Sequence, residues 1–209
     1  MDTPRLPFPC LMLVTDRHLA GGEDALVHAV REAVAGGVNV VQLREKDLDD
    51  AALSPLAARI RGAISDRARL LVNGRIEVAQ ATNADGVHLS EIAPELSSRP
   101  NAGLVGRSVH SLASAQRREA EGVDYVIFGP VFKTAGHPGV APAGVGALAK
   151  VVRAVRLPVI AIGGITVHHV GDVMDAGAAG IAVIGAILGS PSPRQAAEQL
   201  ARELGTRVA

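Results

Sequence analysis

Polar side chains that could bind an anion or move a proton follow several short apolar segments of this 209-residue chain. Apolar runs of four or five residues are typical of buried parallel strands, whose carboxyl ends meet at one edge of the fold. We therefore expect the side chains at these ends to face a shared site. The candidate substrate-binding residues are Gln42, Arg44 and Lys46 after Asn39–Leu43, Asn73 ending Leu70–Asn73, Ser108 ending Leu104–Ser108, and Lys133, with Thr134, beyond Tyr125–Phe128.

Two of these residues are cations with the spacing of a shared face. Arg44 and Lys46 alternate with Leu43 and Glu45. If the strand pattern continues, alternate residues point to the same side, so both cationic side chains would lie together. This arrangement favours an anionic ligand. The alternative is a surface ion pair between Arg44 and Glu45 or Asp47.

The best candidate for acid–base catalysis is His110, which lies just past an apolar strand. An imidazole both accepts and donates protons near neutral pH. His88 falls within a strand, where we expect a core histidine bonded to a neighbouring backbone group. His168 and His169 begin a helix and are expected to be solvated, or to edge a phosphate site, and His28 is expected to be structural. No histidine pair has metal-ligand spacing and cysteine occurs once, so no metal site is predicted.

Glycines follow two apolar strands near the end of the chain. Pro158–Ile162 leads into Gly163 and Gly164, and Gly180–Ile184 leads into Gly185, with a helix predicted over Val170–Ala176 and capped by Gly177. Backbone N–H groups in such turns can hold a phosphate, and in eight-fold β/α barrels this site follows the last two strands. We therefore predict phosphate binding by Gly163, Gly164, Ile184 and Gly185. The alternative is that the glycines only make tight turns.

The order of the predicted elements defines the fold class. Strands are expected over Leu11–Thr15, Asn39–Leu43, Leu70–Asn73, Gly86–Leu89, Leu104–Ser108, Tyr125–Phe128, Val159–Ile162 and Ile181–Ile184, with helices over Glu23–Ala35, Ala51–Ile64, Ile76–Thr82 and from a Ser111 N-cap to Glu121. Eight strands alternating with helices or helix-length segments favour an α/β fold of the (β/α)₈ TIM-barrel type, as one domain spanning 1–209 with residues 1–9 as an N-terminal extension. An open doubly wound sheet is the alternative, but its G-x-G-x-x-G fingerprint is absent.

Composition bounds the kind of partner. The 21 basic and 21 acidic side chains cancel, and no basic block suggests nucleic acid or a membrane surface. A small-molecule ligand is therefore expected, and a homodimer is one possible assembly. Cys10 is the single cysteine, prolines interrupt residues 1–9, and no apolar run approaches membrane-spanning length. These features predict a soluble, cytoplasmic protein.

The segment Gly129–Gly146 is the one long connection without periodicity. It is rich in glycine, proline and alanine, and it leaves the predicted barrel at the same end as the polar side chains. The segment could close over the site as a lid. A solvated surface loop is the alternative.

These motifs resemble the thiamin phosphate synthase/TenI superfamily over nearly the whole chain. The shared motifs are Q-L-R-E-K (Gln42–Lys46), V-N (Val72–Asn73), G-V-H-L (Gly86–Leu89), D-Y-V-I-F-G-P-V-F (Asp124–Phe132) and A-I-G-G-I (Ala161–Ile165), in family order and spacing. The resemblance implies a (β/α)₈ barrel that binds a thiazole phosphate on the loops after its last two strands.

Departures from the synthase pattern favour the tautomerase branch of this superfamily. By resemblance, synthases hold the Mg²⁺ of a diphosphate substrate with two aspartates, and Gly74 and Ala93 stand at those positions. Neither side chain supplies an oxygen ligand for a hard cation. The runs V-N-G-R (Val72–Arg75) and G-R-S-V-H-S (Gly106–Ser111) instead look like TenI, whose proposed proton-transfer histidine matches His110.

The expected function is therefore an isomerase reaction in thiamin biosynthesis. Its substrate would be 2-carboxy-4-methylthiazol-5(2H)-ylidene ethyl phosphate, which becomes aromatic when a proton moves from C2 to the exocyclic carbon. The resemblance implies that His110 carries this proton, that Arg44 or Lys46 binds the carboxylate, and that no cofactor is needed. The alternatives are a thiamin phosphate synthase, which is a transferase, and a non-catalytic regulatory protein that binds thiazole phosphate.

Overall fold

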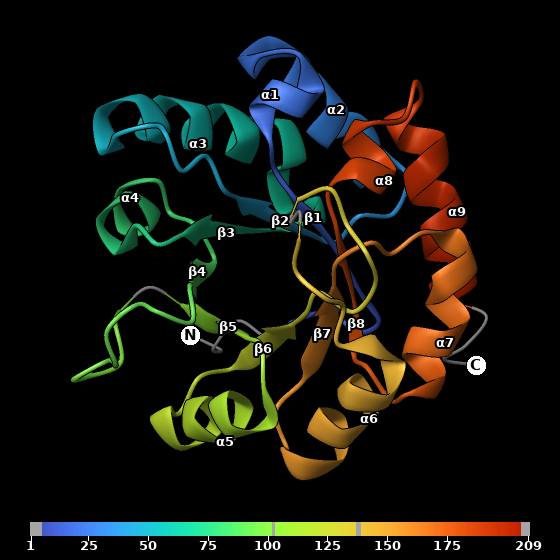
Figure 1. The fold of residues 1–209 in the computed structure, drawn as a ribbon. Helices are drawn as coiled ribbons and strands as arrows, with labels where there is room; N and C mark the ends of the chain where they lie inside the picture. Colours follow the sequence, from blue (N-terminus) through green and yellow to red (C-terminus); the bar gives the residue numbers. More distant parts are fainter. Residues whose placement is uncertain (1–5, 102, 137–138, 206–209) are drawn as a thin grey trace.

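The structure is a computed structural model that describes residues 6–101, 103–136 and 139–205. Eight parallel strands in these residues form a closed barrel in sequence order, with β1 paired to β8 (Figure 1). The strands are β1 (Cys10–Val14), β2 (Val40–Leu43), β3 (Arg69–Asn73), β4 (Gly86–Leu89), β5 (Leu104–Val109), β6 (Tyr125–Phe128), β7 (Val159–Ile162) and β8 (Gly180–Val183). The predicted (β/α)₈ TIM barrel is confirmed, and the open sheet is excluded by the pairing of β1 with β8.

Helices form a ring outside the strands (Figure 1). They are α1 (Arg17–Ala20), α2 (Glu23–Ala35), α3 (Asp50–Ile64), α4 (Ile76–Ala81), α5 (Leu112–Glu121), α6 (Gly144–Ala154), α7 (Val170–Asp175), α8 (Gly185–Leu188) and α9 (Pro193–Gly205), with 3₁₀ turns η1 (Ser65–Arg67) and η2 (Val167–His169). The predicted cap is confirmed, since the Ser111 hydroxyl accepts a hydrogen bond from the Ser114 N–H.

Three of these helices do not follow from the sequence patterns recognised above. The long connection ends at residue 143 rather than 146, because α6 begins at Gly144. Its two glycines weaken the helical pattern, but Leu148 and Val151 bury against the barrel and stabilise the helix. The short helix α8 and the C-terminal helix α9 also lie outside the predicted set, and α9 packs against α2.

The apolar core has two parts that follow the alternation of each strand. One part fills the barrel interior and includes Met12, Leu71, Tyr125 and Ile160. The other lies between strands and helices and includes the buried face of α2. Tyr125 fills its layer closely, since a Cβ atom on Gly106 would overlap its ring. The interior below the site is therefore solid, as expected for a TIM barrel.

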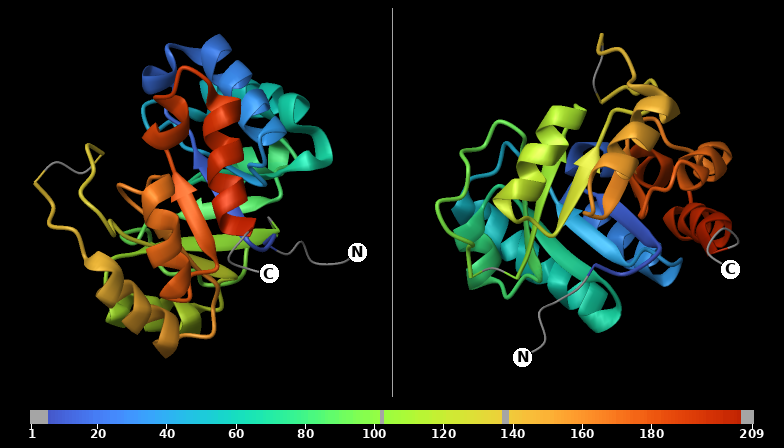
Figure 2. Two further views of the ribbon diagram at one scale, coloured as in Figure 1. Left: turned by 90° about the vertical axis from the view of Figure 1, so that its right-hand side faces the viewer. Right: turned by 90° about the horizontal axis from the view of Figure 1, so that it is seen from below.

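The two ends of the barrel differ. At the amino end of the strands, Leu6 packs against the interior cluster, and the Asn39 amide donates to the carbonyl of Pro9 at 2.8 Å. At the opposite end, the connection between β6 and α6 extends away from the barrel (Figure 2). No helix in the described ranges is long and apolar enough to cross a bilayer.

Candidate active site

The carboxyl ends of β2 to β5 carry polar side chains at positions that continue the interior alternation. Gln42 and Asn73 make one pair, in which the Gln42 amide donates to Asn73 Oδ1 at 3.3 Å. His88 and Ser108 make a second pair, with 2.9 Å between His88 Nε2 and Ser108 Oγ. Asn73 and His88 are also register partners in β3 and β4, so the two pairs adjoin. The structure thus brings these sequence-predicted polar residues together at the mouth.

The opposite side of the mouth is apolar. Ile162 at the end of β7 and Ile184 just after β8 are partly buried and pack against the interior cluster. A flat ring could rest against these two side chains while its polar atoms face β2 to β5. The mouth therefore has one polar and one apolar side.

His88 is held as a neutral side chain below the mouth. Its Nδ1 lies 3.1 Å from the Tyr125 hydroxyl, so both ring nitrogens have side-chain partners. Burial lowers the pKa of His88 to about 3, with further lowering from the charges of Arg107 and Arg44. The prediction of a satisfied core histidine is confirmed, but the prediction of a backbone partner is wrong, because interior side chains occupy both nitrogens.

Glu45 does not pair with Arg44. Its buried carboxylate accepts from the Thr15 hydroxyl at 2.6 Å and from the Arg17 backbone N–H at 3.1 Å, and it forms an ion pair with the Arg17 guanidinium. Asp47 also pairs with Arg17, at 2.6 Å. The ion-pair alternative for Arg44 is therefore wrong, because Arg17, which follows β1, takes both carboxylates.

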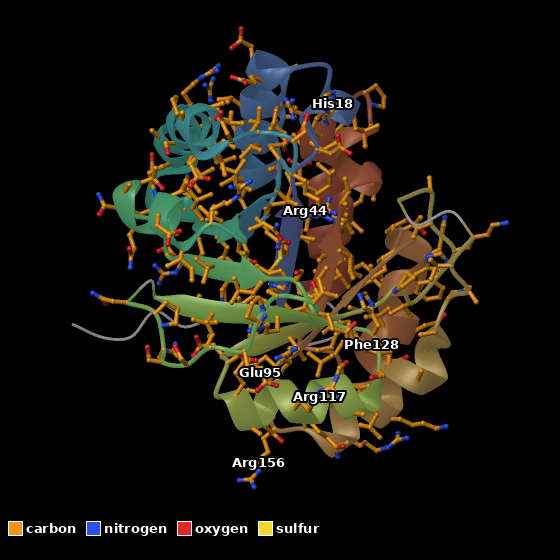
Figure 3. The ribbon with its side chains drawn as sticks, turned by 60° about the vertical axis from the view of Figure 1, so that its left-hand side comes forward. His18, Arg44, Glu95, Arg117, Phe128 and Arg156 are labelled. Atoms are coloured by element: carbon orange, nitrogen blue, oxygen red, sulfur yellow. The ribbon has the colours of Figure 1, made fainter. Side chains whose placement is uncertain are left out.

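Arg44 and Lys46 are left without a carboxylate partner among the ion pairs of the described residues. Arg44 is half-buried near the centre of the molecule, whereas Arg156 extends from its outer edge (Figure 3). The positive charge of Arg44, followed by partial burial, lowers the pKa of Lys46. A bound anion would offset the repulsion that Lys46 experiences from Arg44.

His110 lies beside the loop that follows β4. Its Nδ1 hydrogen-bonds to the Gly129 carbonyl, and its Nε2 lies 3.8 Å from Glu91 Oε2. The His110 backbone N–H donates to Glu91 Oε1 at 3.3 Å. The carbonyl accepts from Nδ1–H, which leaves Nε2 facing the Glu91 carboxylate and solvent. This is a suitable geometry for a group that exchanges protons, and its role remains a prediction.

Two buried arginines hold the loop after β4, and the sequence interpretation missed them. Arg107 donates to the carbonyls of Ser90 and Ala93 at 3.1 Å each and to Pro94 at 2.6 Å, and it pairs with Glu121. Arg118 donates to the Glu91 carbonyl at 2.9 Å and also pairs with Glu121 at 2.9 Å. Neighbouring residues of a strand point to opposite faces, and Ser108 in β5 points into the barrel. This alternation could have shown that Arg107 points outward, toward the helices.

The glycine turns after β7 are crowded on one side. A Cβ atom on Gly163 would lie 2.6 Å from Pro130, and one on Gly164 would overlap the backbone oxygen of Lys133. The N–H of Phe132 donates to the Gly163 carbonyl at 2.9 Å, which joins the two loops. These two glycines are therefore required by close packing, whatever they bind. The space around Gly185 is open, with one carbon of Leu19 at 4.0 Å from a Cβ built there.

The remaining predicted residues lie around this region. Ile184 immediately precedes α8, and Lys133 is exposed, with its backbone packed on Gly164. His168 is exposed as expected. His169 is not simply solvated, because its ring stacks on Phe132 with centroids 4.0 Å apart and its Nδ1 lies 3.0 Å from the Gly164 carbonyl. His28 is exposed on α2.

The residues at the mouth do not fit the Mg²⁺ site expected from the synthase pattern. Gly74 and Ala93 lack oxygen ligands, and a Cβ atom on Gly74 would meet nothing within 4 Å. No group of three or more histidine, cysteine, aspartate or glutamate side chains in the described part of the chain is arranged to hold a metal ion. The described residues at the mouth therefore do not provide the carboxylate ligands that a Mg²⁺ site of this kind needs.

The fold and site define a TIM barrel with a polar and cationic mouth, and comparison with known proteins identifies its family. A sequence profile described as thiamine monophosphate synthase matches residues 11–187. The chain belongs to this family, and it is an enzyme of thiamin biosynthesis.

Individual relatives agree with this assignment. The chain is 43% identical to a putative thiamine-phosphate synthase of Geobacter sulfurreducens over 95% of both chains, and 38% identical to a thiamine-phosphate synthase of Roseiflexus castenholzii, covering 95% of this chain and 91% of the relative. The structure of a thiamine phosphate pyrophosphorylase from Pyrococcus furiosus matches with a TM-score of 0.84 and 33% identity, covering 96% and 97% of the two chains. A 3-hexulose-6-phosphate synthase, at 18% identity and a TM-score of 0.72, shares the fold.

The expected tautomerase function, and with it the isomerase class and the TenI branch, is wrong. Relatives with 38–43% identity over most of the chain carry the synthase name. The expectation gave too much weight to two missing aspartates and to the short motif around His110. The similarity that extends along the whole barrel favours the synthase alternative.

Proposed function

We propose that this enzyme is a transferase that forms thiamin phosphate. The pyrimidinylmethyl carbon of a hydroxymethylpyrimidine diphosphate loses its bond to the diphosphate oxygen and gains a bond to the ring nitrogen of a thiazole phosphate. The diphosphate leaves with the electron pair of the broken bond. The reaction requires two phosphorylated substrates at one site, and the names of the relatives support it.

The observation that carries this proposal is the presence of two candidate anion sites at one barrel mouth. The unpaired cations Arg44 and Lys46 follow β2, whereas the glycine turns follow β7 and β8. β1 alone lies between β2 and β8 in the barrel, so the two regions are close to each other at the mouth. A diphosphate at the cations and a monophosphate at the glycine turns would hold their reactive groups near each other.

The other mouth residues receive complementary roles in this proposal. Gly163, Gly164, Ile184 and Gly185 hold the thiazole phosphate, with Lys133 as a nearby cation. Gln42, Asn73 and Ser108 contact polar atoms of the pyrimidine, and Ile162 supports a ring on the apolar side. His110 supplies a proton to the departing diphosphate, because the carbon transfer itself moves none.

A second candidate is a protein that binds thiazole phosphate without transferring anything to it. The specific observation that favours it is the lack of metal-binding side chains at Gly74 and Ala93. Such a protein needs the glycine turns but not the cation pair after β2.

One experiment separates these candidates. The purified chain is incubated with both substrates in the presence of Mg²⁺, and thiamin phosphate is quantified over time, with Arg156→Gln as a matched charge-loss control for Arg44→Gln. We expect multiple turnovers for the unmodified chain and for Arg156→Gln, and strongly reduced turnover for Arg44→Gln. Binding of the thiazole phosphate with no product in any reaction would reject the transferase and favour the binding protein.

A further inference from the structure

The carboxylates near β2, β3 and β4 are engaged elsewhere, which bears on how a diphosphate could be neutralised. Glu45 and Asp47 pair with Arg17, and Asp50 pairs with Arg75 at 2.7 Å. Glu91 accepts the backbone N–H of His110. To ligate a metal ion, these carboxylates would have to give up their existing partners. Gly74 and Ala93 supply no oxygen ligands either.

The backbone at the first cation after β2, Arg44, is held by its neighbours. The buried Thr15 hydroxyl accepts from the Arg44 backbone N–H at 2.9 Å and donates to Glu45 at 2.6 Å. This contact fixes the backbone at Arg44 and holds the Glu45 side chain toward Arg17. Because the acidic residue between them is committed, Arg44 and Lys46 keep their charges for a ligand. Cations on a fixed segment lose less freedom when they bind an anion.

We infer that this chain neutralises the diphosphate group with the side chains of Arg44 and Lys46, and not with a carboxylate-bound divalent cation. The inference rests on the proposed function, which requires a diphosphate substrate. A guanidinium offers a planar fork of donors to phosphate oxygens, and an ammonium adds a compact charge. Together they take the place of the metal ion that Gly74 and Ala93 are unable to hold.

Calorimetric titration with inorganic pyrophosphate tests this inference without any turnover. The chain is titrated in EDTA and again in excess Mg²⁺, together with Arg44→Gln, Lys46→Gln and the control Arg156→Gln, whose side chain is exposed on the outer surface. We expect pyrophosphate to bind in EDTA, with no gain in affinity from Mg²⁺. Losing one charged hydrogen-bond donor should weaken binding by about tenfold or more. The control should bind normally, and the melting temperature of each variant shows that it is folded.

The inference is overturned if pyrophosphate binds only with Mg²⁺, fails to bind in EDTA, or binds in EDTA equally well to folded Arg44→Gln and Lys46→Gln. These outcomes are independent of the transfer assay. Turnover that accompanies strictly Mg²⁺-dependent pyrophosphate binding would support the transferase and reject the cation pair. Metal-independent binding through Arg44 and Lys46 without turnover would support the cation pair and reject the transferase.

Discussion

His88 is a buried base whose two ring nitrogens are both occupied by neighbouring side chains. Tyr125 and Ser108 provide these contacts inside the barrel. The pKa of the Tyr125 phenol is raised well above its ordinary value, chiefly by burial, so it stays protonated beside His88. The trio is a neutral polar layer between the solid apolar interior and the mouth. Protonation of the His88 imidazole would put an unpaired charge in the core.

We predict that His88 makes folding stability depend on pH. Its pKa is about 3 in the folded chain and 6.5 when exposed, so the unfolded state binds more protons between these values. The contribution of His88 is complete above about pH 6.5 and is lost as the pH falls toward about 3. Denaturant titrations between pH 6 and 4 measure the free energy of unfolding as a function of pH. For the unmodified chain this free energy should change by up to about 1.4 kcal/mol per pH unit more than for His88→Gln. Exposed His168→Gln is the matched control, and an equal slope in His88→Gln would contradict the prediction.

We predict that His110 acts on the rate of transfer and not on binding. His110→Gln keeps similar size but removes the basic nitrogen near Glu91, so kcat should fall by about 10²-fold or more. The affinity for pyrophosphate should stay unchanged, because Arg44 and Lys46 hold it. His28→Gln, an exposed change on α2, controls for handling of the protein. A stable His110→Gln variant with normal kcat would leave His110 without a catalytic role.

Single residues show why the site was only partly readable from sequence. Position at the ends of predicted parallel strands was enough to place Gln42, Asn73 and Ser108 at the mouth, because the carboxyl ends of barrel strands meet there. The ion-pair partners of Glu45 and Asp47 could not be predicted from the sequence, because Arg17 lies about 30 positions away along the chain. Glu91 was also missed, since its place beside His110 depends on how its loop is folded.

Among the elements, the loop between β4 and β5 is held mainly by side chains of β5 and α5. Glu121 accepts the backbone N–H of Leu96 at 2.9 Å and pairs with Arg107 and Arg118. Burial acts to raise the pKa of Glu121, but these bonds and charges outweigh it and lower the pKa below its ordinary value. The carboxylate therefore stays charged between two buried guanidinium groups.

We predict that Arg107→Met destabilises the chain strongly. Removing Arg107 takes one cationic partner from buried Glu121 and the guanidinium donor from the carbonyls of Ser90, Ala93 and Pro94, at a cost of about 3–5 kcal/mol. Chemical denaturation measures this loss, and limited proteolysis should show new cleavage between Ser90 and Asn101. Arg99→Met breaks a more exposed pair with Asp124 and exposed hydrogen bonds to the carbonyls of Gly122 and Gly103, and it should cost less than about 1 kcal/mol. Similar losses for both variants would show that the buried network does not hold the loop.

The glycine turns after β7 and β8 make different predictions. Gly185→Asp should weaken binding of inorganic phosphate by about tenfold or more while leaving stability unchanged, because it adds a charge in open space. Gly164→Ala should instead lower stability by at least about 1–3 kcal/mol, since its φ is 67° and its Cβ atom would overlap Lys133. Phosphate titration and thermal melting measure the two effects. Gly62→Asp on α3 is the control, and normal phosphate affinity of Gly185→Asp would exclude Gly185 from the site.

At the level of the whole molecule, regular repetition made the fold predictable. The strands are short and mostly apolar, and the predicted strand bounds agree with the structure to within one residue at either end. The C-terminal helix α9 was missed because no strand follows it to mark a further unit. The reaction was not predictable from two positions, because glycine at 74 and alanine at 93 affect a single metal site, whereas the family match extends over residues 11–187.

The connection from β6 to α6 also has a consequence for protein engineering. The N–H groups of Ala143 and Gly144 donate to the carbonyls of Pro130 and Val131 at 2.8 and 3.1 Å, so the two ends of the connection are tied together at its base. Once the ends are joined, doubling the length of a flexible loop costs only about 0.6 kcal/mol. Segments of other lengths could therefore be grafted onto this stem at a small cost in folding free energy while the barrel keeps its shape.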